Sequence, residues 1–456
     1  MEAGYRIQQK DQHGAITLIH NTTNGDGSVR HREAIATITG ERSMKSSMTR
    51  IKLLVYLIGV LSALPAGAQY YTNYPTLDNP SHYLESYHGD IRVREDQTQA
   101  AFLLVLLNLL SPIEGIRQDD MVPPGDLKAI GLSERLYGVA ELNKDILPRA
   151  LTAIRDEIDI QQGVYRILPD RLIDMQRSIA SKIGEQPNLE DITKLAAISF
   201  VHPDPLIRIA SAPLLIVLTD GEQEALEELR RGTQLKDQRL SLLATTLLAR
   251  FSAKDSALEQ LTEEQKPGAD PTENPHSTLV IHGTWANDEN WWRNGYPFFE
   301  YLEHEVQMDD LYIGDKPFAW TGTWSHDARK QAATELATWA TKNNKACLNI
   351  VAHSHGANIG FIASSGIPFG RMILLSTPAH PHRYSPKPEN YQSIFSLRVH
   401  LDLVVLADGG GNRFPANWSG VEEKYIGWFN HSSTHYESRW EKNNVPSWLA
   451  TDKTCQ

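Results

Sequence analysis

Short apolar runs alternate with helical stretches in the C-terminal part of this chain, and that alternation limits the fold more than any other feature. The runs are "STLVIHG", "KPFAWTG", "CLNIVAHS", "RMILLSTP", "SIFSLRVHLD" and "EKYIGWFN". Strands that alternate with helices form a mostly parallel sheet, because each parallel connection needs a crossover that a helix can supply. We therefore predict an α/β domain over residues 278–451, with helices on both faces of its sheet.

A different pattern precedes this domain. Segments between residues 97 and 261 carry apolar residues at the i, i+3, i+4 spacing of amphipathic helices, for example "EQEALEELRRG". The segments "DPLIRIASAPLLIVLT" and "DQRLSLLATTLLARF" align with Arg208 on Arg239, a pattern typical of HEAT-like repeats and equally of a generic helical bundle. We predict a separate all-α domain over 69–261, with a surface on which a protein partner could dock. The polar, proline-containing segment 262–277 is the expected linker.

The N-terminal region contains a pattern typical of export. "MTRIKLLVYLIGVLSALPAGAQ" begins at Met48 and combines basic residues, a short apolar run and an Ala-Gly-Ala cleavage pattern before Gln69. We predict a signal peptide over 48–68, a periplasmic or secreted mature protein, and a disordered upstream extension over 1–47. An uncleaved membrane anchor is the alternative, although the apolar run is shorter than the ~20 residues that span a bilayer.

Charge and cysteine content narrow the function further. The formal net charge of −12 argues against nucleic acid as a partner, because phosphate binding needs a basic surface. The two cysteines, Cys347 and Cys455, could form a disulfide in an exported protein. An unpaired, buried Cys347 is the alternative.

The segment "CLNIVAHSHGANIG" places one serine, Ser354, between an expected strand and an expected helix. A nucleophile elbow has the pattern G-x-S-x-G, and here Ala352 replaces the first glycine. The nucleophile of such an elbow adopts a strained positive φ. The alternative is a serine that caps the helix in a non-catalytic turn. "HGTWA" follows the first strand, so the N–H groups of Thr284 and His355 could form an oxyanion hole.

Candidates for an acid and a base follow later strands. Asp402 directly follows the strand "SIFSLRVHL", and a carboxylate at a strand end can orient an imidazole. Asp408, in "LADGGGN", is the competing carboxylate, although its glycine-rich surroundings are typical of a turn. His431 and His435 both follow the last strand, and we favour His431 as the base because it is nearer the strand end.

The chain order of serine, aspartate and histidine resembles that of the α/β-hydrolase fold, and in particular of lipase-like and esterase-like members with an H-S-H-G elbow. The resemblance covers about residues 278–449 and rests on "VIHGTW", "AHSHGANIG", "LDLVV" and "NHSS". It implies Ser354 as nucleophile, His431 or His435 as base, Asp402 as the residue that orients the base, and no cofactor. The implied reaction is hydrolysis of a carboxylic ester, from a small molecule or a lipid, through an acyl-enzyme.

Other interpretations use the same residues. Transfer of the acyl group to an acceptor other than water has the same sequence pattern, and an inactive hydrolase-like domain on a helical binding scaffold would retain it. The pairs His353-x-His355 and His380-x-His382 could ligate a metal, but no carboxylate completes a recognised spacing, so we predict no metal site. Five tryptophans are expected near the site, as pocket lining or as core: Trp285, Trp291, Trp292, Trp320 and Trp324.

Overall fold

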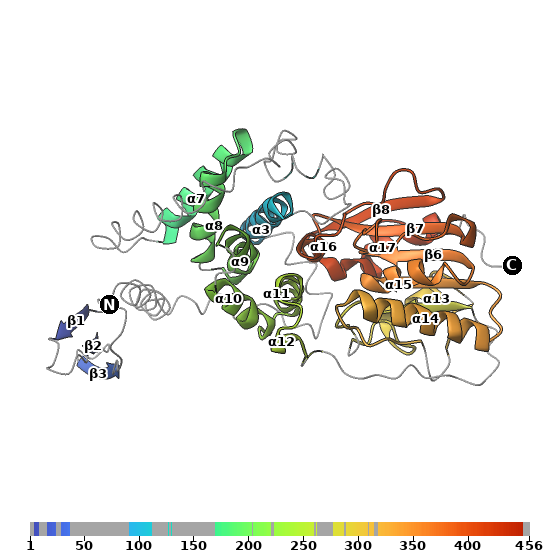
Figure 1. Ribbon diagram of the computed structural model, residues 1–456, viewed down its shortest axis with the longest axis horizontal. Coiled ribbons are helices and arrows are strands. Elements are labelled where there is room, and N and C mark those ends of the chain that lie inside the picture. The colour runs from blue at the N-terminus through green and yellow to red at the C-terminus, as the bar shows by residue number, and fades with distance from the viewer. Residues whose placement is uncertain are drawn as a thin grey trace. The chain divides into compact units, whose positions relative to one another are not determined.

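The computed structural model of the protein describes most of the chain from residue 91 onward and three strands before it (Figure 1). The described residues are 4–8, 16–23, 29–36, 91–111, 126, 129, 169–202, 204–219, 223–259, 261, 277–286, 289–308, 310–313 and 318–449. Contacts divide the chain into two compact units, Met1–Pro80 and Ser81–Gln456. The predicted signal peptide (48–68) and nearly all of the predicted linker (262–276) lie outside the described residues.

The first unit contains an antiparallel sheet of three strands in the order β1-β2-β3. Its strands are β1 (Gly4–Gln8), β2 (Ile16–Thr23) and β3 (Val29–Ala36). We expected no regular structure in this part, which is polar and without apolar periodicity. Antiparallel pairing is made by backbone groups and does not need that periodicity. Whether residues 1–47 are an upstream extension stays a prediction.

The second unit begins with helices. They are α3 (Ile91–Leu110), α7 (Pro169–Glu185), α8 (Leu189–Phe200), α9 (Pro205–Thr219), α10 (Gln223–Thr233), α11 (Gln238–Phe251) and α12 (Ser256–Glu259). From α7 to α11 each helix packs on the next, and α3 packs on α9 (Figure 1). Their shared core is made mostly of leucine, isoleucine and alanine side chains, with Phe102 and Val105 of α3. Burial of these apolar faces stabilises the bundle more than helix propensity does.

The two similar segments form α9 and α11, on either side of α10 in the chain. Gly232 of α10 allows a close approach to α11, because an added Cβ would lie 2.5 Å from the Cβ of Ala244. The aligned arginines make different contacts. Arg208 pairs with Glu228 of α10 at 2.8 Å, whereas Arg239 pairs with Asp237, the cap of its own helix, at 2.7 Å. The assignment to HEAT-like repeats therefore stays a prediction.

The second unit continues as an α/β structure. Its sheet has the order β4-β5-β6-β7-β8, and all neighbouring strands are parallel. The strands are β4 (Thr278–Ile281), β5 (Leu348–His353), β6 (Phe369–Leu375), β7 (Tyr391–His400) and β8 (Val421–Trp428). The predicted α/β class is confirmed.

One expected strand is absent. The described residues of "KPFAWTG", Phe318–Gly322, form no strand. The indole N–H of Trp320 donates to the carbonyl oxygen of His282 at 2.9 Å, and Gly322 has a φ of 68° that ends any extended run. The apolar character of this segment comes from burial of single side chains against the core.

Helices cover both faces of the sheet. Along β5, Ile350 and Ala352 belong to one apolar core, while Val351 between them belongs to the other. The first core contains residues of α14 (His326–Lys342) and α15 (His355–Ala363). The second contains residues of α13 (Pro297–His304), α17 (Glu437–Lys442) and α18 (Val445–Leu449). This period of two produces a three-layer arrangement that leaves the carboxyl ends of the strands at one edge.

The helical bundle contacts the α/β part through α16 (Leu403–Asp408), the helix that follows β7. The amide of Asn108 on α3 donates to the carbonyl oxygen of Leu406 at 2.9 Å, and Arg250 on α11 donates to that of Ala407 at 3.1 Å. Apolar residues of α16 belong to the same core as the bundle. The bundle thus supports the segment that follows Asp402.

Candidate functional site

Ser354 occupies a strained turn between β5 and α15. Its φ of 53° and ψ of −129° are unusual for a residue with a side chain, and its N–H donates to the carbonyl oxygen of Leu375 at 2.8 Å. Two glycines make room for the turn. An added Cβ would lie 2.5 Å from the His282 oxygen at Gly356, and 2.9 Å from the Ser354 Cβ at Gly283. The backbone after β4 therefore lies directly against the serine.

Backbone strain recurs along the whole carboxyl edge of the sheet. A residue other than glycine adopts positive φ after each of the five strands: Trp285 (55°), Ser354 (53°), Ser376 (47°), Leu401 (49°) and Phe429 (63°). Such conformations cost of order 1–3 kcal/mol each and persist only where surrounding contacts impose them. Strain of this kind concentrates at functional sites, so this edge is the natural place for a site.

Asp402 and His431 form a buried pair at this edge. Nδ1 of His431 lies 2.8 Å from Oδ2 of Asp402, and neither residue is more than 4% exposed. The other oxygen, Oδ1, accepts from the N–H groups of Val404 at 3.0 Å and Val405 at 3.1 Å. An ionised carboxylate only accepts hydrogen bonds, so Nδ1 carries the proton and Nε2 keeps its lone pair.

The loop after β8 is held in place by Ser376, the residue that follows β6. Residues His431–His435 form a 3-10 helix capped by the Asn430 side chain. The Ser376 hydroxyl donates to the carbonyl oxygen of His431 at 2.7 Å and lies 3.0 Å from Oγ1 of Thr434. These contacts fix the backbone that positions the His431 ring.

His435 has a different environment from His431. Its ring stacks on Trp291 with centroids 4.5 Å apart and planes 7° apart. Burial, and after it the nearby His431, lower the pKa of His435 to about 3. The structure thus brings His431, and not His435, to Asp402, and it leaves His435 as a neutral, packed ring.

His353, directly before the serine, joins this group, and sequence reasoning assigned it no role at the base. Its ring meets that of His431 edge-on at 4.7 Å and that of His435 at 5.0 Å. Burial, followed by the two neighbouring histidines, holds the pKa of His353 well below its usual range. Oγ of Ser354 and the ring of His431 share no hydrogen bond, although the His353 contact brings the two residues into one neighbourhood. Such hydrogen bonds often tighten only in a substrate complex.

Two backbone donors lie beside Ser354. The N–H groups of Thr284 and His355 donate to no protein acceptor in the described part of the chain. The side chains of the same two residues are joined, with Thr284 Oγ1 2.8 Å from Nδ1 of His355. This bond ties the turn after β4 to the start of α15, so it holds together the two segments that carry these N–H groups.

Asp408, the competing carboxylate, lies at the other end of α16 and is also buried. Its Oδ2 lies 2.6 Å from Nε2 of His380, and its Oδ1 lies 3.3 Å from Nε2 of His355. Oδ1 also accepts from the indole N–H of Trp324 at 3.2 Å. Burial by itself would raise the pKa of Asp408, but its interactions with His355 and His380 outweigh burial and hold that pKa well below its ordinary value. Burial lowers the pKa of His355 to about 4.

Two groups of described side chains could hold a metal ion, His355 with His380 and Asp408, and Glu300 with Glu303 and His304. The ligand atoms of each group lie within 4.8 Å of one another. The two histidine pairs of the sequence, His353-x-His355 and His380-x-His382, do not form the groups that could hold a metal ion. The structure separates them, and joins His355 to His380 through a carboxylate that the spacing did not indicate.

The five tryptophans that were expected near the site lie in three different surroundings. Trp291 and Trp324 contact the polar residues just described. Trp292 and Trp320 pack on the ring of His282, whose pKa burial lowers to about 4. Trp285 packs against the apolar core shared with the helical bundle.

Three further observations bear on the class of protein. Cys347 is disulfide-bonded, and the other cysteine of the chain, Cys455, lies outside the described residues. In the described part of the chain, no helix combines the length and the apolar character that crossing a bilayer requires. No family model, curated protein or solved structure matches the chain.

Proposed function

We propose that the protein is an exported serine hydrolase of α/β-hydrolase type that cleaves carboxylic esters. The observation that carries the proposal is the strained Ser354 at the same sheet edge as the buried Asp402–His431 pair. A serine at positive φ between a parallel strand and a helix is the geometry of a nucleophile elbow. The disulfide-bonded Cys347 and the signal-like sequence from Met48 support export.

The first chemical step uses the tautomer that Asp402 imposes. Nε2 of His431 takes the proton of the Ser354 hydroxyl while Oγ attacks the carbonyl carbon of the ester. The negative charge that develops on the carbonyl oxygen is stabilised by the N–H groups of Thr284 and His355. His431 then returns the proton to the alcohol oxygen as its bond to the acyl carbon breaks.

The second step frees the serine. Water attacks the acyl group on Ser354, and Nε2 of His431 takes its proton as base and returns it to Oγ. Asp402 stays ionised throughout and stabilises the imidazolium that forms twice in the cycle. The two hydrogen bonds from α16 to Oδ1 hold this carboxylate in one orientation.

A fluorophosphonate probe tests the proposal, because it labels only a serine that a base activates. We expect labelling of the wild type and none of Ser354→Ala. Ser376→Ala is the matched control, since Ser376 is also buried, follows a strand and has positive φ, yet its hydroxyl is bound to the His431 loop. The Ser376→Ala variant should still be labelled at Ser354, but more slowly than the wild type, because the loop that carries His431 is less firmly held. If Ser354→Ala were labelled as strongly as the wild type, or if the folded wild type were not labelled, Ser354 would not be the nucleophile.

A further inference from the structure

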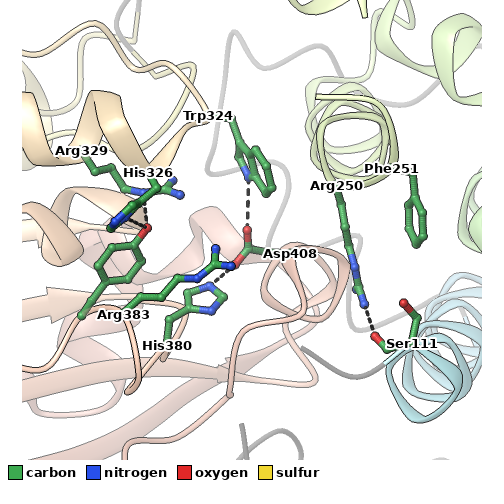
Figure 2. Close-up of a pocket in the computed structure, with 10 residues that line it drawn as sticks. Ser111, Arg250, Phe251, Trp324, His326, Arg329, His380, Arg383 and Asp408 are labelled. Carbon is green, nitrogen blue, oxygen red and sulfur yellow. Dashed lines mark hydrogen bonds and ion pairs between the residues drawn. The ribbon is translucent and has the colours of Figure 1, made fainter. Parts of the chain in front are cut away.

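A second feature of the α/β edge is a cavity of about 310 Å³ on the side of Asp408. It is lined from the helical bundle by Arg250 and from the α/β part by Arg329, Arg383 and Asp408, as Figure 2 shows. Its volume suits a small ligand or one end of a larger one. None of the residues proposed for catalysis lines it.

The charges around this cavity are unbalanced. Among the described residues that line it there are three arginines and one carboxylate, that of Asp408. Both oxygens of Asp408 are already used, by His380 on one side and by His355 and Trp324 on the other. In the described structure none of the three arginines has a carboxylate oxygen within ion-pair distance.

Arg329 is the most buried of the three arginines. It is 4% exposed, and its Nε donates to the hydroxyl of Tyr384 at 2.9 Å. Its Nη1 is buried without a hydrogen-bond partner. The guanidinium lies over the rings of Trp324 and Tyr384, 5.8 Å and 5.4 Å from their centroids. A buried cation with an unused donor and no counter-charge is costly unless a ligand supplies the missing acceptor.

The other two arginines extend the same field. Within the described residues Arg250 donates to neutral oxygens, those of Asn108, Ala407 and Ser111. Burial lowers its pKa to about 10, although the charge of Asp408 opposes this shift. Arg383 is exposed and lines the cavity with His326. The pKa of His326 is lowered by burial and then by Lys330, Arg329 and Arg383, which is the effect of a positive surrounding.

We propose that this cavity binds a carboxylate or phosphate group, with Arg329 as its anchor and Arg250 and Arg383 as supporting cations. Planar guanidinium groups bind such anions through paired, charge-assisted hydrogen bonds. The same field opposes a divalent cation at His355, His380 and Asp408, since three fixed positive charges lie around the cavity beside them. The anion is either part of the ester substrate or a separate small ligand, and only the first case rests on the proposed hydrolase activity.

Binding is measured by calorimetry with inorganic phosphate and with succinate, in a sulfonate buffer. We expect the wild type to bind, and Arg329→Gln to bind on the order of 10- to 100-fold more weakly. Lys342→Gln is the matched control, because Lys342 ends the same helix, α14, is exposed and does not line the cavity. It should bind like the wild type.

If Arg329→Gln does not fold, Arg383→Gln is the variant to measure, because Arg383 is exposed and its replacement should not affect folding. Arg383→Gln should also weaken anion binding. No binding by the folded wild type at millimolar anion, or equal loss in Lys342→Gln and Arg329→Gln, would overturn the proposal. Binding of Zn²⁺ alone, lost in His380→Ala, would also overturn it and assign the cluster to a cation.

Kinetics separate the two sources of the anion. If it belongs to the substrate, Arg329→Gln should raise KM for the p-nitrophenyl monoester of succinate and leave that for p-nitrophenyl butyrate unchanged. If it is a separate ligand, phosphate should alter hydrolysis of the neutral butyrate ester by the wild type and not by Arg329→Gln. Either result supports the site, and an enzyme with no ester activity still leaves the calorimetric test in place.

Discussion

The two ends of α16 carry two buried carboxylates, Asp402 and Asp408, that are used in different ways. Asp402 begins the helix and accepts two N–H groups of its first turn, which leaves one oxygen for a single imidazole. Asp408 ends the helix and is bound by side chains alone, two imidazoles and an indole. The same residue type, six positions along one short helix, therefore orients a base at one end and joins loops at the other.

The hydrogen-bond partners of Asp402 and Asp408, and not their burial, distinguish the roles of the two carboxylates. Both carboxylates are at most 3% exposed. The imidazole on Asp402, His431, meets the ring of His353, which directly precedes Ser354. Of the imidazoles on Asp408, His355 uses its second nitrogen on Thr284, and Nδ1 of His380 is buried without a hydrogen-bond partner. The network from Asp408 through His355 to Thr284 positions both proposed oxyanion donors, so we expect it to support catalysis indirectly.

The largest predicted effect belongs to the histidine that Asp402 holds. His431→Ala removes the base and should lower kcat for p-nitrophenyl butyrate by up to about 10⁶-fold. His435→Ala removes only a packed ring near the base and should cost ~10- to 100-fold. The measurement is steady-state kinetics on variants that keep the circular dichroism of the wild type. The reverse ranking would move the base to His435, and full activity in both would end the triad hypothesis.

Replacing the two carboxylates should change kcat by different factors, and the difference should be smaller than that between the two histidine variants. Asp402→Asn leaves His431 in the wrong tautomer, and a change of this kind lowers kcat by about 10⁴-fold. Asp408→Asn should lower kcat by ~10- to 100-fold, because it loosens His355 without touching the base. Comparable losses in the two variants, measured with the same ester, would contradict the distinction drawn between the two ends of α16.

The smallest predicted effect is on stability and depends on pH. Burial lowers the pKa values of His282 and His355 to about 4 and of His435 to about 3. Between pH 6.5 and about 4 the unfolded chain binds these protons and the folded chain does not, so the free energy of unfolding should fall as the pH falls. Each histidine contributes up to about 1.4 kcal/mol per pH unit in that window.

Replacing one of these rings isolates its share. His435→Phe keeps an aromatic ring against Trp291 and cannot be protonated, so urea unfolding at pH 6.5, 5.5 and 4.5 should show a shallower loss than in the wild type. His304→Phe is the control, since His304 is exposed, with 64% of its side chain accessible. A slope unchanged by His435→Phe would mean that this ring is not buried neutral.

The α/β class could be predicted from the sequence, because alternation of apolar runs with helical spacing is a short-range pattern that each segment carries alone. The sequence also indicated where side chains would emerge at strand ends, since Ser354, Asp402 and His431 follow runs that read as strands. It did not indicate that "KPFAWTG" packs without pairing, because burial of single aromatic rings and strand pairing leave the same apolar signature.

Which of these groups contact one another could not be predicted from the sequence and follows from the packing of distant segments. The partner of His431 is Asp402 and that of His380 is Asp408, and no spacing distinguishes the two carboxylates because the loops that carry the histidines come from other strands. The sequence "HDARKQ" also gives no sign that Arg329 is buried with an unused donor in the described structure. In the sequence, Arg329 is simply one polar residue of an amphipathic helix. Periodicity reports which face of an element is apolar, whereas contacts between distant segments depend on how all the elements pack together.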